Sequence, residues 1–304
     1  MQPLYLLAAC ITVSMALLRH VNGAPSVLDT TNDHISANVR RELSTLSPSE
    51  YTLYERSVGH TMHSPIKRDE IIKGLQKKCH KERVLGLTFD DGPYIWHREL
   101  LRTLKEGGDQ MATFFVNGNN YRCIYDKDSV RRLRQTLKHG HLICSHTWSH
   151  TDITTLTNEE LDKQIQLLNE ALWKTVGVIP ACFRPPYGNI RPDQVKYLND
   201  KWGLTVVTWS EDTGDANGDG VKAGLDVYRH LKAPQCAIIL NHETVEATVK
   251  TVIPKALNII RKKGYVRSYS VDDLLGFHAY KKMGVPQQRD ETWTCDGKPQ
   301  PGGK

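Results

Sequence analysis

The 304-residue sequence lacks three patterns: a Cys-x-x-Cys pair, an Asn-x-Ser/Thr sequon, and a long apolar run beyond its N-terminal residues. The first absence argues against a zinc site made of cysteines, and the second removes the acceptor for N-glycosylation. The third argues against a membrane span in the body of the chain. The polar end, Pro299 to Lys304, also lacks the apolar tail of a lipid-anchor signal.

Blocks of like charge are missing as well. Lys and Arg are scattered along the chain apart from short clusters such as Arg261 to Lys263, although the formal net charge is +6. Scattered basic residues of this kind are typical of solvated helix ends rather than of a nucleic-acid surface. We therefore expect no nucleic-acid partner.

The long apolar run that is present lies at the N-terminus. It extends from Leu4 to Leu18 and is followed by small residues near Gly23 and Ala24. This pattern predicts a secretory signal peptide at residues 1–23, with an uncleaved anchor as the alternative. We expect a soluble mature protein without a stable membrane span, secreted to the extracellular space or the cell wall.

Cysteine usage agrees with an oxidising compartment. Removal of Cys10 with the signal leaves six of the seven cysteines. An even number in a secreted protein indicates disulfides, but the sequence does not choose their connectivity. We expect a bridge between Cys79 and Cys295, because both flank the predicted domain and could tie its ends together.

The chain divides into three parts after the signal. Residues 24–78 lack sustained apolar periodicity and are rich in Ser, Thr, Glu and Arg, which predicts a loosely ordered leader or pro-segment. Lys67-Arg68 within it is either a dibasic processing site or an incidental basic pair. Regular patterning then predicts a single domain at residues 79–280, followed by a C-terminal tail at 281–304.

Short apolar or β-branched runs alternate with helical patterns from Val84 onward. The runs lie at 84–89, 111–116, 141–145, 181–184, 204–209, 236–241 and 265–270. The helical patterns lie at 98–106, 129–138, 157–176, 191–201 and 248–262. In the third helix, Thr157 and Glu160 form a capping-box signature and Gly177 can close the end. The alternation predicts an α/β fold with about seven parallel strands, for which a (β/α) barrel fits the length.

Polar residues fall at or just after the C-terminal ends of these runs. They are Asp90, Asp91, Asn117, His146, Arg184, residues 209–215 and His242. In a parallel barrel these strand ends converge on one face, where active sites are built. Residues scattered over the chain are therefore expected to share one pocket.

Two of these segments suggest a metal site. Asp90 and Asp91 stand side by side in the stretch 88–93, whose Gly and Pro are also ordinary turn residues. His146 and His150 are four residues apart and can reach one ion if the segment enters a helical turn. One carboxylate would complete a two-histidine, one-carboxylate set with open positions, and the other would remain free as a base. This is the arrangement of a metal-dependent hydrolase.

Two further segments suggest supporting roles. Arg184 precedes a Pro-Pro turn, and a guanidinium beside a carboxylate lowers the pKa of that carboxyl and fixes its orientation. His242 at a strand end can protonate a leaving group, and the acids within 209–215 can hold it in its charged form. A structural salt bridge and a structural histidine are the respective alternatives.

Five segments in this order resemble the five motifs of the polysaccharide deacetylases, the NodB-like carbohydrate esterase family 4. They are Thr88 to Pro93, His146 to His150, Arg184 to Gly188, Trp209 to Asp215 and Leu240 to His242. Residues 116–120 and 140–142 look particularly like those of fungal chitin deacetylases. The resemblance covers roughly residues 84–276 and implies a distorted barrel of βα units.

The resemblance implies a role for each polar residue of the metal site. Asp90 would be the general base, and Asp91, His146 and His150 would bind a divalent metal, usually zinc, with cobalt as an alternative. Arg184 would orient Asp90 for catalysis.

On the substrate side, the resemblance implies that His242 is the general acid, tuned by Asp215. Tyr187 would offer its backbone N–H to the oxyanion, and Trp209 and Asn117 would also belong to the substrate site. The activity implied is hydrolysis of N-acetyl groups on the N-acetylglucosamine residues of chitin, which releases acetate and leaves chitosan.

Two departures from the family pattern bear on the substrate. Ala216 follows Asp215 where many members have an aromatic residue, and Glu243 follows His242 where Asp is common. We expect Ala216 to leave the wall of the site near His242 more open. Neither change removes a catalytic group, so both bear on substrate preference rather than on activity.

Other functions fit the same residues. An acetyl xylan esterase or a peptidoglycan deacetylase would use the same machinery, and a non-catalytic chitin-binding protein is a third reading. Asp90 and His242 argue against the last, because binding alone needs neither a base nor an acid. We expect a monomer whose partner is chitin or a related N-acetylglucosamine polymer.

Overall fold

A curled sheet of nine strands organises the computed structural model, which describes residues 71–304. These residues belong to one compact unit. The predicted signal peptide, Lys67-Arg68 and most of the predicted leader lie outside the described residues.

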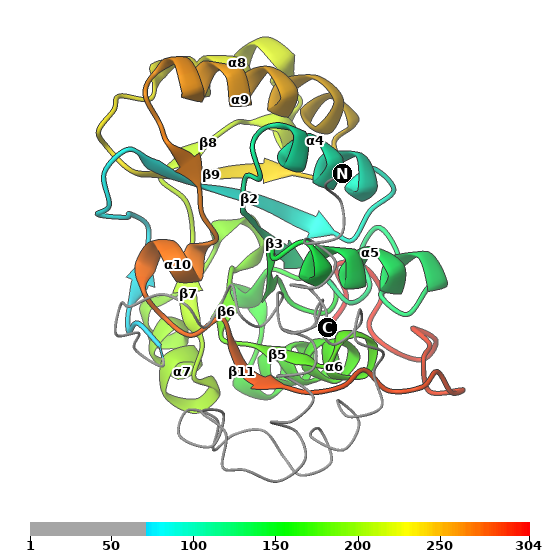
Figure 1. Cartoon of the computed structure of the whole chain (residues 1–304). Coiled ribbons are helices and arrows are strands. Elements are labelled where there is room, and N and C mark those ends of the chain that lie inside the picture. The colour runs from blue at the N-terminus through cyan, green and yellow to red at the C-terminus, as the bar shows by residue number, and fades with distance from the viewer. Residues whose placement is uncertain (1–70) are drawn as a thin grey trace, which may run out of the picture. The chain divides into compact units, whose positions relative to one another are not determined.

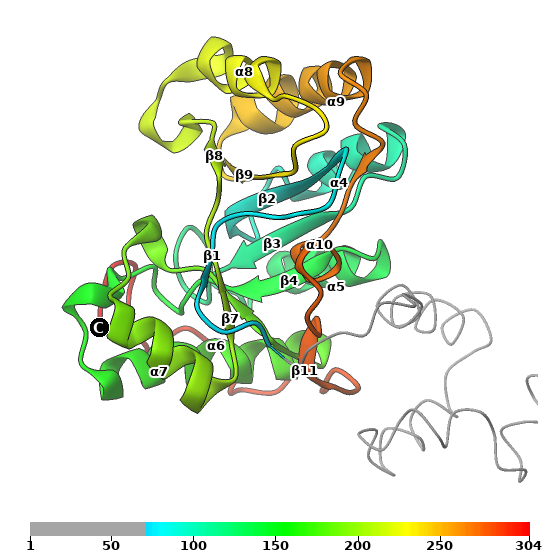
Figure 2. The ribbon, with the colours of Figure 1, turned by 90° about the vertical axis from the view of Figure 1, so that its left-hand side faces the viewer.

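The strands follow the spatial order β1-β7-β6-β4-β3-β2-β9-β8, with β10 also paired to β2 (Figure 1). Their bounds are β1 Leu75–Gln76, β2 Val84–Gly92, β3 Ala112–Val116, β4 Leu142–Ser145, β6 Cys182–Phe183, β7 Thr205–Val207, β8 Glu211–Asp212, β9 Ala237–His242 and β10 Arg267–Ser268. All of these strand pairs are parallel. Because β1 and β8 lie at opposite edges, the barrel is open, and Figure 2 shows the sheet from its β1 side. A separate antiparallel pair joins β5, Val178–Pro180, to β11, Tyr280–Met283.

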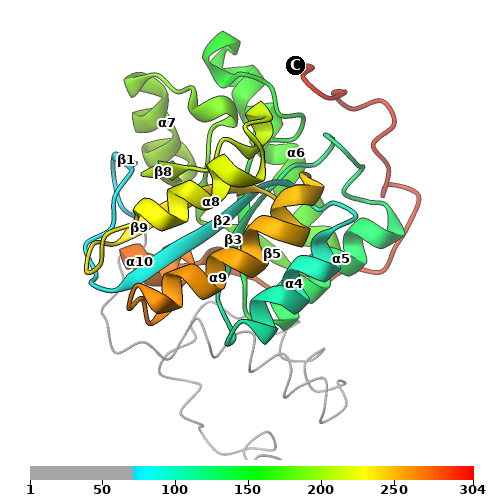
Figure 3. The ribbon, with the colours of Figure 1, turned by 90° about the horizontal axis from the view of Figure 1, so that it is seen from above.

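Helices follow most of the strands. The α-helices are α4 His97–Glu106, α5 Lys127–Lys138, α6 Asn158–Val176, α7 Pro192–Trp202, α8 Gly220–His230, α9 Ile253–Lys262 and α10 Val271–Leu275. Short 3-10 turns are η2 Ile153–Thr155, η3 Pro186–Gly188 and η4 Asp215–Asn217, and η5, Thr248–Val252, is a π-helical turn. Figure 3 shows α9, α4 and α5 side by side along the sheet.

The hydrophobic core occupies both faces of the sheet. On the outer face, β2, β3 and β9 bury residues such as Leu87 and Ile239 against α4, α5, α6, α8 and α9. On the inner face, Phe115 and Ile238 pack against Leu274 of α10 and against Phe277. With both faces covered, the central strands are apolar almost throughout, as parallel strands usually are.

The sequence pattern placed the main elements correctly. All seven predicted strand runs contain a strand, and the α/β fold of parallel strands in a distorted barrel is confirmed. Helix α6 begins at the capping box of Thr157 and Glu160 and ends at Gly177, whose φ is +70°. The pattern missed β1, β5, β8, β11, α8 and α10, most of which are too short to show a periodicity.

The predicted disulfide between Cys79 and Cys295 is wrong. The bridges are Cys79–Cys236, Cys123–Cys295 and Cys144–Cys182. Cys236 directly precedes β9, and Cys79 precedes β2, its partner in the sheet. The two ends of the domain are therefore not cross-linked to each other: Cys79 is bonded to Cys236, and Cys295 is bonded to Cys123.

Both ends of the described chain are part of the fold. Residues 75–76, predicted as leader, form the edge strand β1 against β7. In the tail, residues 280–283 form β11, and the bridge from Cys295 follows it. No helix among residues 71–304 combines the length and the apolar character that crossing a bilayer would take.

Candidate active site and metal centre

The parallel register brings the strand-end residues to one face. Asp90 at the end of β2 is paired in register with His242 at the end of β9. On the other side of β2, β4 ends at Ser145, so His146 leaves the sheet at the same edge. The backbone N–H of Arg184 donates to the carbonyl of Ser145, which places the arginine there too. The structure therefore gathers residues separated by about half of the chain.

Three of these side chains form a group that can hold a divalent metal. Ligand atoms of Asp91, His146 and His150 all lie within 4.8 Å of one another. The Oδ1 of Asp91 is 3.2 Å from Nε2 of His150 and 3.7 Å from Nε2 of His146. That Oδ1 is buried and has no hydrogen-bond partner. A cation would satisfy an oxygen that is otherwise costly to bury.

His146 and His150 are in the neutral form that binds a metal. Nδ1 of His146 donates to the backbone carbonyl of Arg184 at 2.7 Å, which leaves Nε2 with a free lone pair. Burial lowers the pKa of His146 well below its usual value and that of His150 to about 4. Both imidazoles are therefore neutral near pH 7, the form that binds a metal. Burial also raises the pKa of Asp91 to about 6.

Backbone strain is concentrated at this site. Positive φ angles occur at the non-glycine residues Asp91 (+71°), Thr147 (+72°), His150 (+56°) and Tyr187 (+60°). Such conformations are costly for residues with a Cβ and persist only where the surrounding structure enforces them. The loop that carries the histidine ligands therefore depends on contacts from outside itself.

Asp90 is held by a fully buried arginine. Nη1 of Arg184 donates to Oδ1 of Asp90 at 2.8 Å, and its other nitrogens donate to the backbone carbonyls of Val207 and Thr208. The guanidinium also stacks on the ring of Phe115, 3.9 Å from its centroid. Burial raises the pKa of Asp90 to about 6, because desolvation outweighs the opposing charge of Arg184. The arginine thus fixes the carboxylate but does not depress its pKa below the usual value.

His242 is paired with Asp215. Its Nδ1 lies 2.7 Å from Oδ1 of Asp215, and its backbone N–H donates to Oδ2 at 2.8 Å. The hydroxyl of Thr248 donates to the same Oδ2. Burial lowers the pKa of His242, but the hydrogen bond and charge of Asp215 outweigh it and raise that pKa to about 9. His242 is therefore protonated near neutral pH and can act as an acid.

The three residues predicted on the substrate side have different surroundings. Tyr187 is 62% exposed, and its ring centroid lies 4.6 Å from that of His150. Trp209 is half-buried, 5.5 Å from the guanidinium of Arg184. Asn117 is buried, and its amide donates to the carbonyl of His146. Substrate contact by these three residues stays a prediction.

The sequence did not indicate the surroundings of Glu243. It is fully buried, and its Oε1 accepts from the backbone N–H of Tyr94 at 2.9 Å while Oε2 pairs with Nδ1 of His97. A Cβ on Gly92 would lie 1.7 Å from its Oε1. Glu243 thus joins the turn after Asp91 to the end of β9, and its effect on substrate preference stays a prediction. Ala216, in contrast, is exposed.

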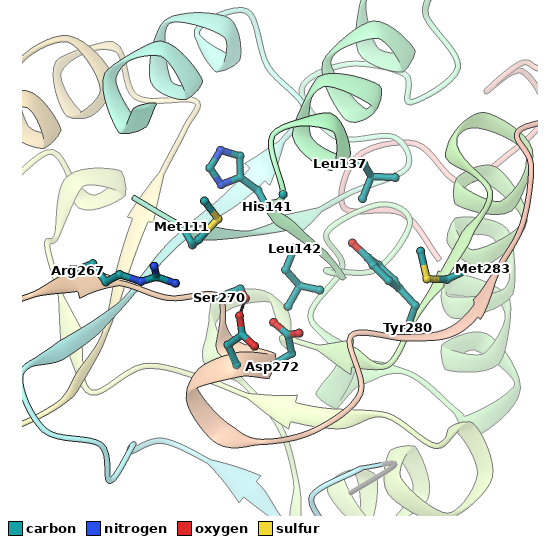
Figure 4. Close-up of a pocket in the computed structure, with 11 residues that line it drawn as sticks. Met111, Leu137, His141, Leu142, Arg267, Ser270, Asp272, Tyr280 and Met283 are labelled. Carbon is teal, nitrogen blue, oxygen red and sulfur yellow. Dashed lines mark hydrogen bonds between the residues drawn. The ribbon is translucent and has the colours of Figure 1, made fainter. Parts of the chain in front are cut away.

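A hollow lies at the opposite ends of the strands. Met111, just before β3, and His141, just before β4, line it with Arg267, Ser270 and Tyr280 (Figure 4). Burial lowers the pKa of His141 to about 3, so this histidine is neutral. None of the residues of the candidate active site lines this hollow.

Comparison with known proteins identifies the family of this chain. The family model described as polysaccharide deacetylase matches residues 77–207. A chitin deacetylase of Pestalotiopsis sp is 35% identical over 188 residues, which cover 61% of this chain and 62% of that protein. A chitin deacetylase of Colletotrichum lindemuthianum is 30% identical over 240 residues, which cover 72% of this chain and 90% of that protein.

The similarity extends to three dimensions. The solved structure of the chitin deacetylase from the fungal pathogen Colletotrichum lindemuthianum superposes with a TM-score of 0.65 at 27% identity, covering 75% of this chain and all of that one. The fold and the site together define a hydrolase of the deacetylase class. The chain belongs to the polysaccharide deacetylase family.

Proposed function

We propose that this protein is a secreted, zinc-dependent chitin deacetylase, which hydrolyses the N-acetyl groups of N-acetylglucosamine residues. The observation that carries the proposal is the pairing of Asp90 with His242 across β2 and β9, beside the group of Asp91, His146 and His150. A base, an acid and a metal-ligand set thus lie together. The chitin deacetylases among the relatives support chitin as the substrate.

The chain's own residues account for the proton transfers. A divalent cation bound by Asp91, His146 and His150 would polarise the acetamide carbonyl and lower the pKa of water. Asp90, oriented by Arg184, accepts the proton of the attacking water. The tetrahedral intermediate then collapses as the C–N bond breaks. His242 donates its proton to the departing amine, and the products are acetate and the free amino sugar.

Acetate release from chitin oligomers tests the proposal. Purified protein is incubated with zinc and oligomers, and acetate is measured against the Asp90→Asn variant, which keeps the shape of the side chain but loses the base. Acetate release that depends on Asp90 is expected. Release no higher than that of the variant would refute the proposed activity.

Parallel substrates test the alternatives. Acetylated xylan and peptidoglycan are assayed beside chitin, because the same residues can hydrolyse acetyl esters and other N-acetyl groups. We expect the highest rate on chitin. If the metal-loaded protein were retained by chitin in a pull-down but released no acetate, it would be a binding protein.

The proposed location and organisation need their own measurements. The apolar run at residues 1–23 and the three disulfides support secretion. N-terminal sequencing of protein collected from the medium of a eukaryotic host would show cleavage near Gly23 and any later removal of the proposed leader. Light scattering after size exclusion would test the proposed monomer.

A further inference from the structure

The C-terminal segment follows helix α6 from end to end. The N–H of Gln287 donates to the carbonyl of Lys174 near the C-terminal end of α6, at 2.8 Å. Nζ of Lys304 lies 3.6 Å from Oε2 of Glu160, in the first turn of the same helix. Figure 3 shows this segment in red, running past α5 and α6. Residues 295–303, which we call the strap, include its contacts with the loop between and beside the two histidine ligands.

The strap is bound to the loop that carries the histidine ligands, residues 146–151, which we call the ligand loop. Nε1 of Trp148 donates to the carbonyl of Pro299 at 3.0 Å, and the N–H of Gly302 donates to the carbonyl of Ser149 at 2.6 Å. The amide of Asn119 donates to the same carbonyl of Pro299 at 3.1 Å. Both contact residues of the loop lie between His146 and His150.

One carbonyl of the strap satisfies three side-chain donors. The oxygen of Gly303 accepts from the hydroxyls of Ser149 and Thr151, each at 2.5 Å, and from Nε2 of Gln164 at 3.1 Å. Ser149 and Gln164 are 0% exposed. Buried donors without an acceptor are costly, so the position of Gly303 is coupled to that of the ligand loop.

The ligand loop needs such support because it is strained. Thr147 and His150 both have positive φ, although Thr147 is β-branched. The strap is itself fastened by the bridge from Cys295 to Cys123, in the loop after β3. A covalently anchored segment is therefore hydrogen-bonded to a strained loop.

We infer that the strap is a positioning element of the metal centre, which keeps His146 and His150 in the geometry that a divalent cation requires. The inference rests on the proposed function, since it needs a metal at Asp91, His146 and His150. Neither the family model, which ends at residue 207, nor the sequence motifs include the strap.

A shortened chain tests the inference. A chain ending at Gln300 keeps the Cys123–Cys295 bridge and Pro299 but loses Gly302 and Gly303. Its affinity for zinc is measured by competition with a chromophoric chelator, beside the full chain. The matched control is Gln300→Ala in the full chain, because the exposed side chain of Gln300 does not touch the ligand loop.

We expect zinc binding about 10- to 100-fold weaker for the shortened chain, the usual effect of losing groups that orient metal ligands. The control should bind zinc as the full chain does. Circular dichroism and the thermal midpoint of the metal-free proteins separate this effect from a loss of folding. Unchanged zinc affinity with a lower midpoint would show that the strap only stabilises the fold, and would overturn the inference.

A second variant keeps the test decisive if the shortened chain does not fold. Thr151→Val removes one of the donors to Gly303 with little change of shape, and it should weaken zinc binding in the same direction by a smaller factor. Zinc affinity equal to that of the full chain would then refute the inference. A full chain that binds no zinc would refute the proposed metal centre itself, a different outcome from either of these.

Discussion

The pairing of His242 with Asp215 offers the sharpest test of the proposed chemistry. Asp215 raises the pKa of His242 from 6.5 to about 9 although burial alone lowers it. That shift corresponds to roughly 3 kcal/mol in favour of the charged imidazole, at about 1.4 kcal/mol for each pKa unit. Asp215→Asn removes the charge and keeps the size, so burial should dominate and the pKa of His242 should fall below 6.5.

The direction of the pH effect follows from the role of His242 as a proton donor. With a pKa of about 9, His242 is almost fully charged at pH 7. In Asp215→Asn at most about a quarter of the molecules would carry the proton at that pH. The alkaline limb of kcat/KM should therefore move from about 9 to below 6.5, and activity at pH 7 should fall at least about fourfold.

The free energy of unfolding should also fall as the pH rises and His242 loses its proton. A raised pKa of His242 stabilises the fold below pH 6.5, and this contribution is lost as the pH rises through about 9. Urea unfolding of the metal-free protein should show this loss in the wild type and less of it in Asp215→Asn. Asp193→Asn, an exposed carboxylate of α7, is the control for loss of a negative charge. An alkaline limb that stays near 9 in Asp215→Asn would refute our assignment of the acid.

Three further changes test other parts of the structure. Asp91→Asn should lower the zinc content measured by mass spectrometry of the purified protein, and an unchanged content would contradict its role as a ligand. Glu243→Ala leaves Nδ1 of His97 buried without its partner, although Nε2 keeps its contact with Thr136, and it should lower the free energy of unfolding by about 1 to 3 kcal/mol. A free energy of unfolding equal to that of the wild type would contradict this structural role. Cys123→Ser should destabilise the protein by about 2 to 4 kcal/mol in urea unfolding, because its bridge to Cys295 closes a long loop. An unfolding midpoint equal to that of the wild type would argue that this bridge contributes nothing.

Local patterns predicted the parts of the structure that depend on near neighbours. The helix from Thr157 to Gly177 is encoded by its caps and by apolar residues at helical spacing. The strand runs are encoded by apolar stretches between helical patterns, and the polar residues at their ends were expected to meet. Parallel strands bring those ends to one edge whatever the lengths of the connections between them.

Contacts between distant segments were less predictable. The bridges Cys79–Cys236 and Cys123–Cys295 join residues 157 and 172 positions apart. Glu243 is an acid beside a candidate catalytic histidine, and nothing in its neighbourhood showed that His97 would bury with it. A side chain's own sequence context indicates whether it is polar or apolar but not which remote group it will meet.

The sequence by itself determined the order of seven of the strands and five of the helices along the chain, the strand-end position of Asp90 and His242, and the family resemblance. Only the tertiary structure decided that Asp90 and His242 are paired in register, that Glu243 is buried, and that the strap is hydrogen-bonded to the loop of His146 and His150. The physical reason is that hydrophobic periodicity is local and repeated, whereas these contacts are single and long-range. They follow from how the sheet curls and where the end of the chain packs.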